Sequence, residues 1–399
     1  MLKILVIAEG IGYSACGIVY ERIISELSKS NQVDVLTCLS NLEQNTNINT
    51  EKINNIIEPK CLLSKWKRHL FFDQISYILM GRSIREMFYS KYYDINTKQY
   101  DIVLSMCSVF QLFPLELGDK LVRKYGGTLA CYFVDPVPMP AWWLKGGSVK
   151  DGLMKYIRWK VATMSNKGIE RHLHKIIGKV SYWASSNSCM LSYQMQYLPK
   201  SCNFTSVLLT PNDGKIKLFP KSDIKDHVFL YTGNLYGLRK SEYLISGFAK
   251  LLEKYPNSYL YFVGTAQDAI SNCPSNVLDH IKFFSFTKDL APFYAKATAL
   301  LDIDAAIDND VFLSSKITNY LLINRPIISE TGRNSPSRQL FADINSILQC
   351  NHSSEDLYKA MVQSIEHKFD YSDRKNILYQ FTVEGVVNKF LEELKHILY

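Results

Sequence analysis

The first half of the chain alternates short, unbroken apolar runs with longer amphipathic stretches. The runs are too short for helices and are bounded by glycine, proline or polar residues, so each predicts a buried strand. Strands are expected at 3–8, 33–36, 101–104, 129–134 and 180–184, and helices at 18–27, 115–124, 150–178 and from Ser188 onward. Apolar strands that alternate with helices indicate a parallel sheet covered on both faces.

A second alternation of the same kind follows a cluster of turn formers, Thr210-Pro211-Asn212-Asp213-Gly214, which marks a domain boundary. The expected strands are 228–231, 259–263, 281–284, 299–303 and 326–328, and the expected helices are 241–254, 290–297 and 316–322. The last forty residues favour helices. The pattern predicts two doubly wound α/β domains facing a central cleft, where the carboxyl ends of both sheets bind ligands. The first domain comprises 1–209, completed by a helix within 380–399, and the second comprises 215–379.

Composition narrows the class of protein. Of the 399 residues, 47% are hydrophobic and 21% are charged, and no window approaches the ~18–20 apolar residues that span a bilayer. The apolar start is interpreted as a strand and not as a signal peptide, because it stops at Glu9-Gly10 without a cleavage site. We therefore expect the chain to stay in the cytoplasm. The nine cysteines are scattered singly and the histidines lack a ligand spacing, so we expect no disulfide framework and no metal site.

The net charge of +8 suits an anionic partner and is concentrated among aromatic residues in two segments, 60–98 and 142–160. The first contains Lys65, Trp66, Lys67, Arg68, His69, Phe71, Phe72, Tyr77, Arg82, Arg85, Phe88, Tyr89, Lys91, Tyr92 and Tyr93, and the second Trp142, Trp143, Lys145, Lys155, Arg158, Trp159 and Lys160. Three interpretations stay open: a solvated helical face over an ordinary core, peripheral contact with an anionic membrane at its inner face, and single-stranded nucleic acid. Nucleic acid is the least favoured, and we expect no such partner.

Three strand-to-helix junctions of the second domain share features that bind phosphate. Gly233-Asn234 leads to Arg239-Lys240, Gly264-Thr265 follows another strand, and Ser314-Ser315-Lys316 opens a helix. Backbone N–H groups beside glycines, hydroxyls and fixed cations are what a nucleotide diphosphate needs. Each feature has an ordinary structural explanation, such as a helix cap or a turn glycine. Their combination on one domain edge favours a phosphate site.

The second half resembles the donor domain of GT-B glycosyltransferases, especially the retaining group called family 4. The resemblance lies in Tyr231-Thr232-Gly233-Asn234 with Leu238-Arg239-Lys240, in 261–265, 281–297 and 314–328, and in the junction 211–214. It implies two Rossmann-like domains and transfer of a sugar, with retention, from a UDP or GDP donor without a metal or other cofactor. It further implies a glycan or lipid-linked acceptor and a role in surface polysaccharide biosynthesis.

Residue by residue, the resemblance assigns Arg239, Ser315 and Lys316 to the donor phosphates. It also likens the first domain's turn, with Gly10, Gly12 and Gly17, to the family's glycine turn beside those phosphates. This chain departs from the family at Asn234, where an arginine is usual, and at Val311 and Asn319, which replace a pair of glutamates. Asn319 can still hydrogen-bond a ribose hydroxyl. Asp308 and Asp310 are candidates to replace the first glutamate.

Catalysis is expected from Arg239, Lys316 and an acceptor-side carboxylate. Asp135 ends a predicted strand, where it would take a proton from the acceptor hydroxyl or stabilise a cationic transition state, or it would only shape a proline-rich turn. Glu9 is a second candidate. Two other classes of function remain open. One is a catalytically silent sugar-nucleotide-binding or scaffolding protein, suggested by Asn234 and Asn319. The other is a dinucleotide-dependent oxidoreductase, disfavoured because residues 10–15 lack the final glycine of Gly-x-Gly-x-x-Gly.

Overall fold

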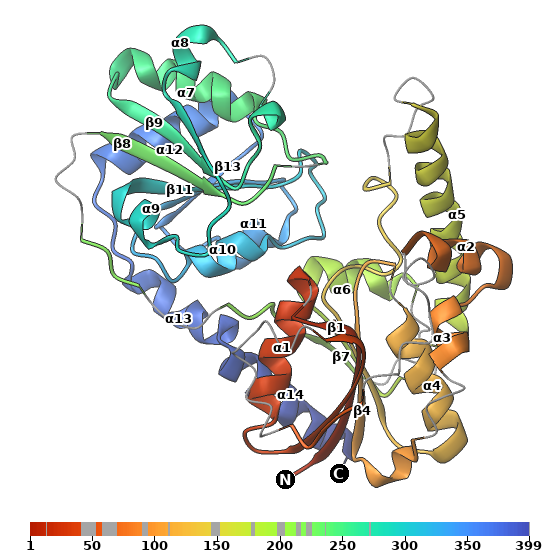
Figure 1. The fold of residues 1–399 in the computed structure, drawn as a ribbon. Coiled ribbons are helices and arrows are strands. Elements are labelled where there is room, and N and C mark those ends of the chain that lie inside the picture. Colours follow the sequence, from red (N-terminus) through yellow and green to blue (C-terminus); the bar gives the residue numbers. More distant parts are fainter. Residues whose placement is uncertain are drawn as a thin grey trace. The chain divides into compact units, whose positions relative to one another are not determined.

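Figure 1 shows the computed structural model of the chain. It describes residues 1–12, 14–40, 53–57, 70–89, 95–110, 112–144, 152–176, 180–197, 204–212, 217–220, 226–235, 237–270 and 273–398. The chain divides into two units, one of Met1–Pro211 with Val383–Tyr399 and one of Asn212–Thr382. The chain therefore passes from unit 1 to unit 2 between Pro211 and Asn212, inside the cluster of turn formers. It returns to unit 1 just before the last helix.

Unit 1 is built on a parallel sheet with the strand order β3-β2-β1-β4-β5-β6-β7. Its strands are β1 (Lys3–Ile11), β2 (Gln32–Ser40), β3 (Asn55–Ile57), β4 (Ile102–Cys107), β5 (Leu129–Phe133), β6 (Tyr182–Ser185) and β7 (Thr205–Val207). Its helices are α1 (Ala15–Leu27), α2 (Leu70–Met80), α3 (Ile84–Tyr89), α4 (Phe113–Tyr125), α5 (Leu153–Ile176), α6 (Ser188–Met195) and α14 (Val383–Leu398), with a 3-10 turn at Thr97–Gln99.

The C-terminal helix α14 belongs to unit 1 because its apolar face completes that unit's core. Val386, Val387, Phe390 and Leu394 are buried in one cluster with α1 and with the side chains that β1 directs to that face. The glutamate that follows Phe390 by three residues, Glu393, accepts hydrogen bonds from Tyr182 and Ser206 at 2.7 Å each. Burial of an amphipathic face supplies most of the stability of such a helix.

Unit 2 repeats the architecture with the strand order β10-β9-β8-β11-β12-β13, again all parallel. Its strands are β8 (His227–Thr232), β9 (Ser258–Val263), β10 (Ile281–Phe284), β11 (Ala297–Ile303), β12 (Ile327–Glu330) and β13 (Ile347–Cys350). Its helices are α7 (Glu242–Lys254), α8 (Ser275–Leu278), α9 (Ala291–Lys296), α10 (Ser315–Tyr320), α11 (Pro336–Leu340), α12 (Ser354–Glu366) and α13 (Lys375–Leu378), with 3-10 turns at Gln267–Ala269, Ser372–Arg374 and Tyr379–Phe381.

The predicted strands and helices are confirmed, most with ends shifted by a few residues. The sequence pattern missed α2 and α3, which lie in the basic, aromatic segment 60–98. For two residues of that segment, the predicted contact with a membrane or with nucleic acid is wrong, because neither is at the surface. Tyr77 is fully buried, and Arg85 is buried in an ion pair with Glu9. Residues 65–69, 91–93 and 145 of the two basic segments lie outside the described residues.

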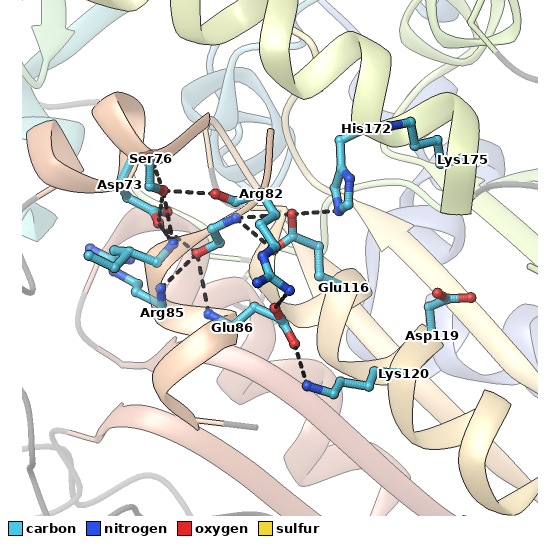
Figure 2. Close-up of polar contacts among 12 residues, drawn as sticks. Asp73, Ser76, Arg82, Arg85, Glu86, Glu116, Asp119, Lys120, His172 and Lys175 are labelled. Carbon is cyan, nitrogen blue, oxygen red and sulfur yellow. Dashed lines mark hydrogen bonds and ion pairs between the residues drawn. The ribbon is translucent and has the colours of Figure 1, made fainter. Parts of the chain in front are cut away.

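A buried polar network holds α2 and α3 against α4 and α5 (Figure 2). Glu116 of α4 accepts a hydrogen bond from the backbone N–H of Ser83 at 3.2 Å and lies 2.9 Å from Nε2 of His172 on α5. Asp73 of α2 accepts from the Ser83 hydroxyl at 2.6 Å. Hydrogen-bonded polar groups in a low-dielectric interior specify one arrangement of the elements that carry them. The network therefore fixes how α5 leaves the body of unit 1.

Candidate functional site

The order of the strands in unit 2 singles out one place at the edge of its sheet. From β8 the chain winds outward to β9 and β10, and it then returns to place β11 on the other side of β8. The connections that leave β8 and β11 therefore diverge at this point. In open parallel sheets, ligands bind outside the carboxyl ends of strands at such a switch point. The predicted phosphate-binding segments begin at Gly233, directly after β8, and at Ser314, in the connection that follows β11.

Two turns that contain glycine form the backbone surface at this edge of the sheet. Gly233 has a φ of 99° and donates its N–H to the Val263 carbonyl at 2.7 Å, and Gly264 has a φ of 85° and donates to the Phe284 carbonyl at 2.9 Å. Both values lie in the region that favours glycine. The Thr265 hydroxyl donates to the Gly233 carbonyl and ties the two turns together. Gly233, Gly264 and Thr265 thus lie together, as the sequence predicted.

The side chain of Lys316 lies against this backbone surface. This side chain passes Gly233 so closely that a Cβ on the glycine would meet Lys316 Cε at 2.9 Å, and its Nζ lies 5.0 Å from the centre of the Tyr231 ring. Ser314 caps α10 by accepting from the Lys316 N–H at 3.3 Å. Tyr320 fixes the other end of α10, because its hydroxyl accepts from the Thr232 N–H at 3.0 Å. The lysine is therefore held in place from both ends of its helix.

Three buried carboxyl groups, which the sequence reasoning did not single out as a cluster, surround the cations. Burial raises the pKa of Asp302 and of Asp304, and the positive charges of Lys316 and Arg239 oppose the rise. Burial also raises the pKa of Asp310 to about 6. Burial and the charge of Arg239 lower the pKa of Lys316 to about 8. A raised pKa favours the neutral form of each carboxyl group, which leaves more of the positive charge of Lys316 and Arg239 for an anionic ligand.

Arg239 and Lys240 differ although they are adjacent. Arg239 is half-buried and pairs across an isolated bridge with Ala305, the second residue after β11, and its charge acts on Asp302, Asp304 and Asp310. Lys240 is exposed. The structure therefore brings Arg239 to the same edge as Lys316 and leaves Lys240 at the surface.

Three polar residues of the predicted donor site lie in different surroundings. Asn234 and Ser315 are exposed. Asn319 is partly buried, and its Nδ2 donates to the Ser315 carbonyl at 3.1 Å. Its Oδ1 is buried and, within the described residues, has no hydrogen-bond partner. The amide oxygen of Asn319 therefore has unused acceptor capacity.

A partly buried histidine and a buried glutamate lie at the neighbouring strand ends. Nδ1 of His352, just after β13, lies 3.0 Å from Oε1 of Glu330, the last residue of β12. The charge of His352 opposes the rise that burial causes in the pKa of Asp310, so this pair belongs to the same polar edge. The sequence reasoning missed it. In the sequence, Glu330 comes at the end of the short apolar run that follows Pro326, and a carboxylate at that place could have indicated a residue of the sheet edge.

The predicted residues of unit 1 lie at the carboxyl end of its own sheet. Gly12 has a φ of 68° and donates its N–H to the Gly17 carbonyl at 2.9 Å, which forms a tight turn before α1. Asp135 follows β5 and accepts from the Cys16 thiol at 3.0 Å, and burial raises the pKa of its carboxyl group. Glu9 is in the ion pair with Arg85, so it is a weaker candidate base than Asp135.

The described residues include neither a metal-binding cluster nor a membrane-spanning helix. No group of three or more histidine, cysteine, aspartate or glutamate side chains among them is placed to hold a metal ion. Within the same ranges, no helix is both long and apolar enough to cross a membrane.

No protein-family model matches the chain, and no curated protein matches its sequence. Solved structures do match along its whole length. A glycosyltransferase of Rickettsia africae has a TM-score of 0.65 at 12% identity, with 100% of this chain and 98% of that chain covered. Alr3699/HepE of Anabaena, in complex with UDP and glucose, has a TM-score of 0.64 at 13% identity, with 99% and 100% covered.

The lipopolysaccharide outer core galactosyltransferase WaaB, in its apo form, has a TM-score of 0.60 at 15% identity, with 99% of both chains covered. The matches at this low identity establish the architecture, and the two parallel sheets of this chain correspond to it. The chain therefore has the GT-B fold of these glycosyltransferases.

Proposed function

We propose that this chain is a glycosyltransferase whose unit 2 binds a nucleotide-diphosphate sugar, with UDP favoured over GDP. One observation carries the proposal: Arg239 and Lys316 come from the two connections that diverge at the switch point, and the charges of both act on Asp302 and Asp304. Because Gly233 carries no side chain, Lys316 lies directly against the backbone turn after β8. UDP is favoured because the similar HepE structure contains UDP and glucose.

The chemistry follows from where charge develops during transfer. The bond between C1 of the sugar and the β-phosphate oxygen breaks, and the departing diphosphate gains negative charge. Arg239 and Lys316 stabilise that charge in a site of low dielectric constant, which is where fixed cations lower a barrier most. The acceptor hydroxyl attacks C1 and loses its proton. Asp135 is the proposed acceptor of that proton, and the retention of configuration is carried over from the family resemblance.

The acceptor is proposed to be a glycan or a lipid-linked glycan, extended at the cytoplasmic face of a membrane during surface polysaccharide biosynthesis. Similarity to a lipopolysaccharide outer core galactosyltransferase supports this choice. No metal ion is assigned to the proposed reaction, because two side-chain cations supply the charge that a diphosphate requires.

The alternative is a protein that binds a sugar nucleotide without transferring the sugar. The neutral Asn234 and Asn319 favour it, since they replace charged residues of the family. It predicts donor binding with no release of nucleotide. The two proposals therefore differ in turnover and not in affinity.

The first experiment is a thermal-shift screen of the purified chain with UDP-, GDP-, ADP- and dTDP-sugars. We expect stabilisation by a UDP-sugar that is lost in Lys316→Ala and kept in Lys296→Ala, which removes an exposed lysine of α9. The assay of UDP released with and without glycan acceptors then separates the transferase from the silent protein. Equal stabilisation of parent and Lys316→Ala would refute the donor site.

A further inference from the structure

The first half of α5 is a helix without a buried residue. All the buried residues of α5, namely Ser165, Gly168, Ile169, Leu173 and Ile176, lie in its second half. Figure 1 shows the first half extending away from the sheet of unit 1. Most helices in proteins are stabilised by packing of one face. A projecting segment of this kind has surface to offer to a partner.

The exposed side chains of this half are aliphatic and basic. Leu153 is 63% exposed, Met154 64% and Met164 52%. Lys155, Arg158 and Lys160 lie among them, and no aspartate or glutamate occurs between 153 and 169. An ordinary solvated helix mixes both signs of charge. Here the apolar and cationic side chains share one short segment.

An apolar groove runs beside this segment. Gly168 lets α5 touch α2, because a Cβ there would lie 2.4 Å from the Tyr77 carbonyl oxygen. Toward the first turns of both helices a groove of about 600 Å³ opens, and Phe71, Phe72, Met154 and Ile157 line it together with Arg158. Apart from Gln74 and Arg158, the residues that line it are apolar. Such a groove accepts hydrocarbon and not a polar chain.

We infer that the first half of α5 and this groove form a docking surface for a bilayer that contains anionic phospholipids. The aliphatic side chains enter the boundary between headgroups and acyl chains, and the lysines and arginine reach the phosphates above it. The charge of this segment is complementary to the negative surface potential of such a membrane. The groove is placed to receive part of an acyl chain.

The same residues argue against other occupants. A second copy of α5 would bring three more cations against these three. Bases of single-stranded nucleic acid need free aromatic faces, but Tyr156 and Trp159 are half-buried, and Lys160 Nζ already lies 5.7 Å and 5.0 Å from their ring centres. Docking would also bring unit 1 to a lipid-linked acceptor, and only this consequence rests on the proposed function.

The test is flotation of the whole chain with vesicles of phosphatidylcholine, alone or mixed with phosphatidylglycerol. We expect binding to the mixed vesicles only, weakened by salt. The variant Lys155→Ala/Arg158→Ala/Lys160→Ala should bind about 100-fold more weakly, since each cation near such a surface contributes about fivefold. The control Lys296→Ala/Lys368→Ala/Lys375→Ala removes the same charge from exposed positions of unit 2 and should bind as the parent does. Met154→Ser/Ile157→Ser keeps the charge and should also weaken binding, about tenfold.

Circular dichroism of each variant checks that it is folded, which we expect because the changed residues of α5 are not buried. The docking surface is refuted if the parent fails to float with the mixed vesicles, or if the α5 variant and the unit 2 control lose equal affinity. Tighter binding of a single-stranded oligonucleotide or of an acidic protein than of vesicles would also overturn it. The UDP-sugar thermal shift is measured on the same samples. If the parent fails to bind vesicles but keeps the UDP-sugar thermal shift, only the docking surface is refuted. If it binds vesicles but shows no thermal shift, only the proposed function is refuted.

Discussion

A methyl group on Gly233 would lie 2.9 Å from Cε of Lys316, so the backbone turn after β8 and the lysine side chain of α10 occupy adjoining space. The turn also requires a φ of 99° at this residue. Each fact ties the shape of the turn to the position of the ammonium group. The glycine therefore governs where a diphosphate would meet its cation.

We predict that Gly233→Ala lowers UDP-sugar affinity at least tenfold, because the added methyl group displaces Lys316 while backbone strain costs about 1–2 kcal/mol of stability. Gly237→Ala is the matched control, since Gly237 has a φ of 67° and its Cβ would meet nothing within 4 Å. Isothermal titration and thermal unfolding of both variants separate the two effects. An equal loss of affinity in the control would show that strain alone, and not the contact with Lys316, is responsible.

The second prediction concerns pH. The pKa of Lys316 is lowered to about 8 by burial and by the charge of Arg239, against the pull of Asp302 and Asp304. The ammonium form binds the diphosphate, so donor affinity should be full below about pH 7 and fall up to tenfold per pH unit above pH 8. Lys316→Arg should keep its affinity between pH 8 and pH 9, because the guanidinium stays charged there. Titrations with UDP across this range check both curves, and a parent curve that is flat above pH 8 would contradict the assignment.

The third prediction separates two adjacent cations. Arg239→Ala should lower donor affinity about 100-fold, since Arg239 is half-buried and its charge acts on three buried aspartates. Lys240→Ala should lower it less than about threefold, because exposed charges are screened. Titration with UDP and the rate of UDP release from the donor measure both variants. Similar losses in the two would mean that Arg239 is only one of several surface cations.

The meeting of separate turns at one edge of unit 2 could be predicted from the sequence for a physical reason. Carboxyl ends of parallel strands meet at one sheet edge, so turns that follow separate strands converge without any knowledge of packing. Gly233, Gly264 and Lys316 were found in this way. The order of the strands, which makes β8 and β11 neighbours, could not be deduced from local patterns.

The rest depended on contacts between distant parts of the chain. Asp302 and Asp304 alternate with apolar residues in 300–304, and only the packing around them shows that both are buried beside Lys316. Arg85 belongs to a segment that is basic on average, but it lies in the interior opposite Glu9, 76 positions earlier. Composition describes a segment, whereas burial is decided residue by residue.

The fourth prediction tests the residue that replaces a glutamate of the family. Oδ1 of Asn319, which has no hydrogen-bond partner in the part of the chain that the structure describes, should accept a hydrogen bond from a ribose hydroxyl. We expect the parent to bind UDP about tenfold more tightly than 2′-deoxy-UDP or 3′-deoxy-UDP, because one buried hydrogen bond contributes about 0.5–1.5 kcal/mol. In Asn319→Ala this preference should vanish. Titration of both proteins with UDP and its two deoxy analogues gives the comparison, and an undiminished preference in the variant would place the ribose elsewhere.

The last prediction concerns stability in unit 1. Burial raises the pKa of Asp73 from 3.8 to about 7, although hydrogen bonds from Ser83 and Ile84 oppose the rise. Between about pH 4 and pH 7 the folded form keeps a proton on Asp73 that the unfolded form has lost. The contribution of Asp73 to the free energy of unfolding therefore falls as pH rises, and above pH 7 it is a penalty of up to about 4 kcal/mol.

Asp73→Asn keeps the oxygen that accepts from Ser83 and cannot ionise. Its stability relative to the parent should therefore grow by about 2.5 kcal/mol between pH 5 and pH 8. Denaturant unfolding followed by tryptophan fluorescence measures this, because all five tryptophans lie in unit 1. Parallel pH profiles for the two proteins would show that Asp73 is ionised in the folded state, and that the network joining α2 to α4 and α5 carries its charge without cost.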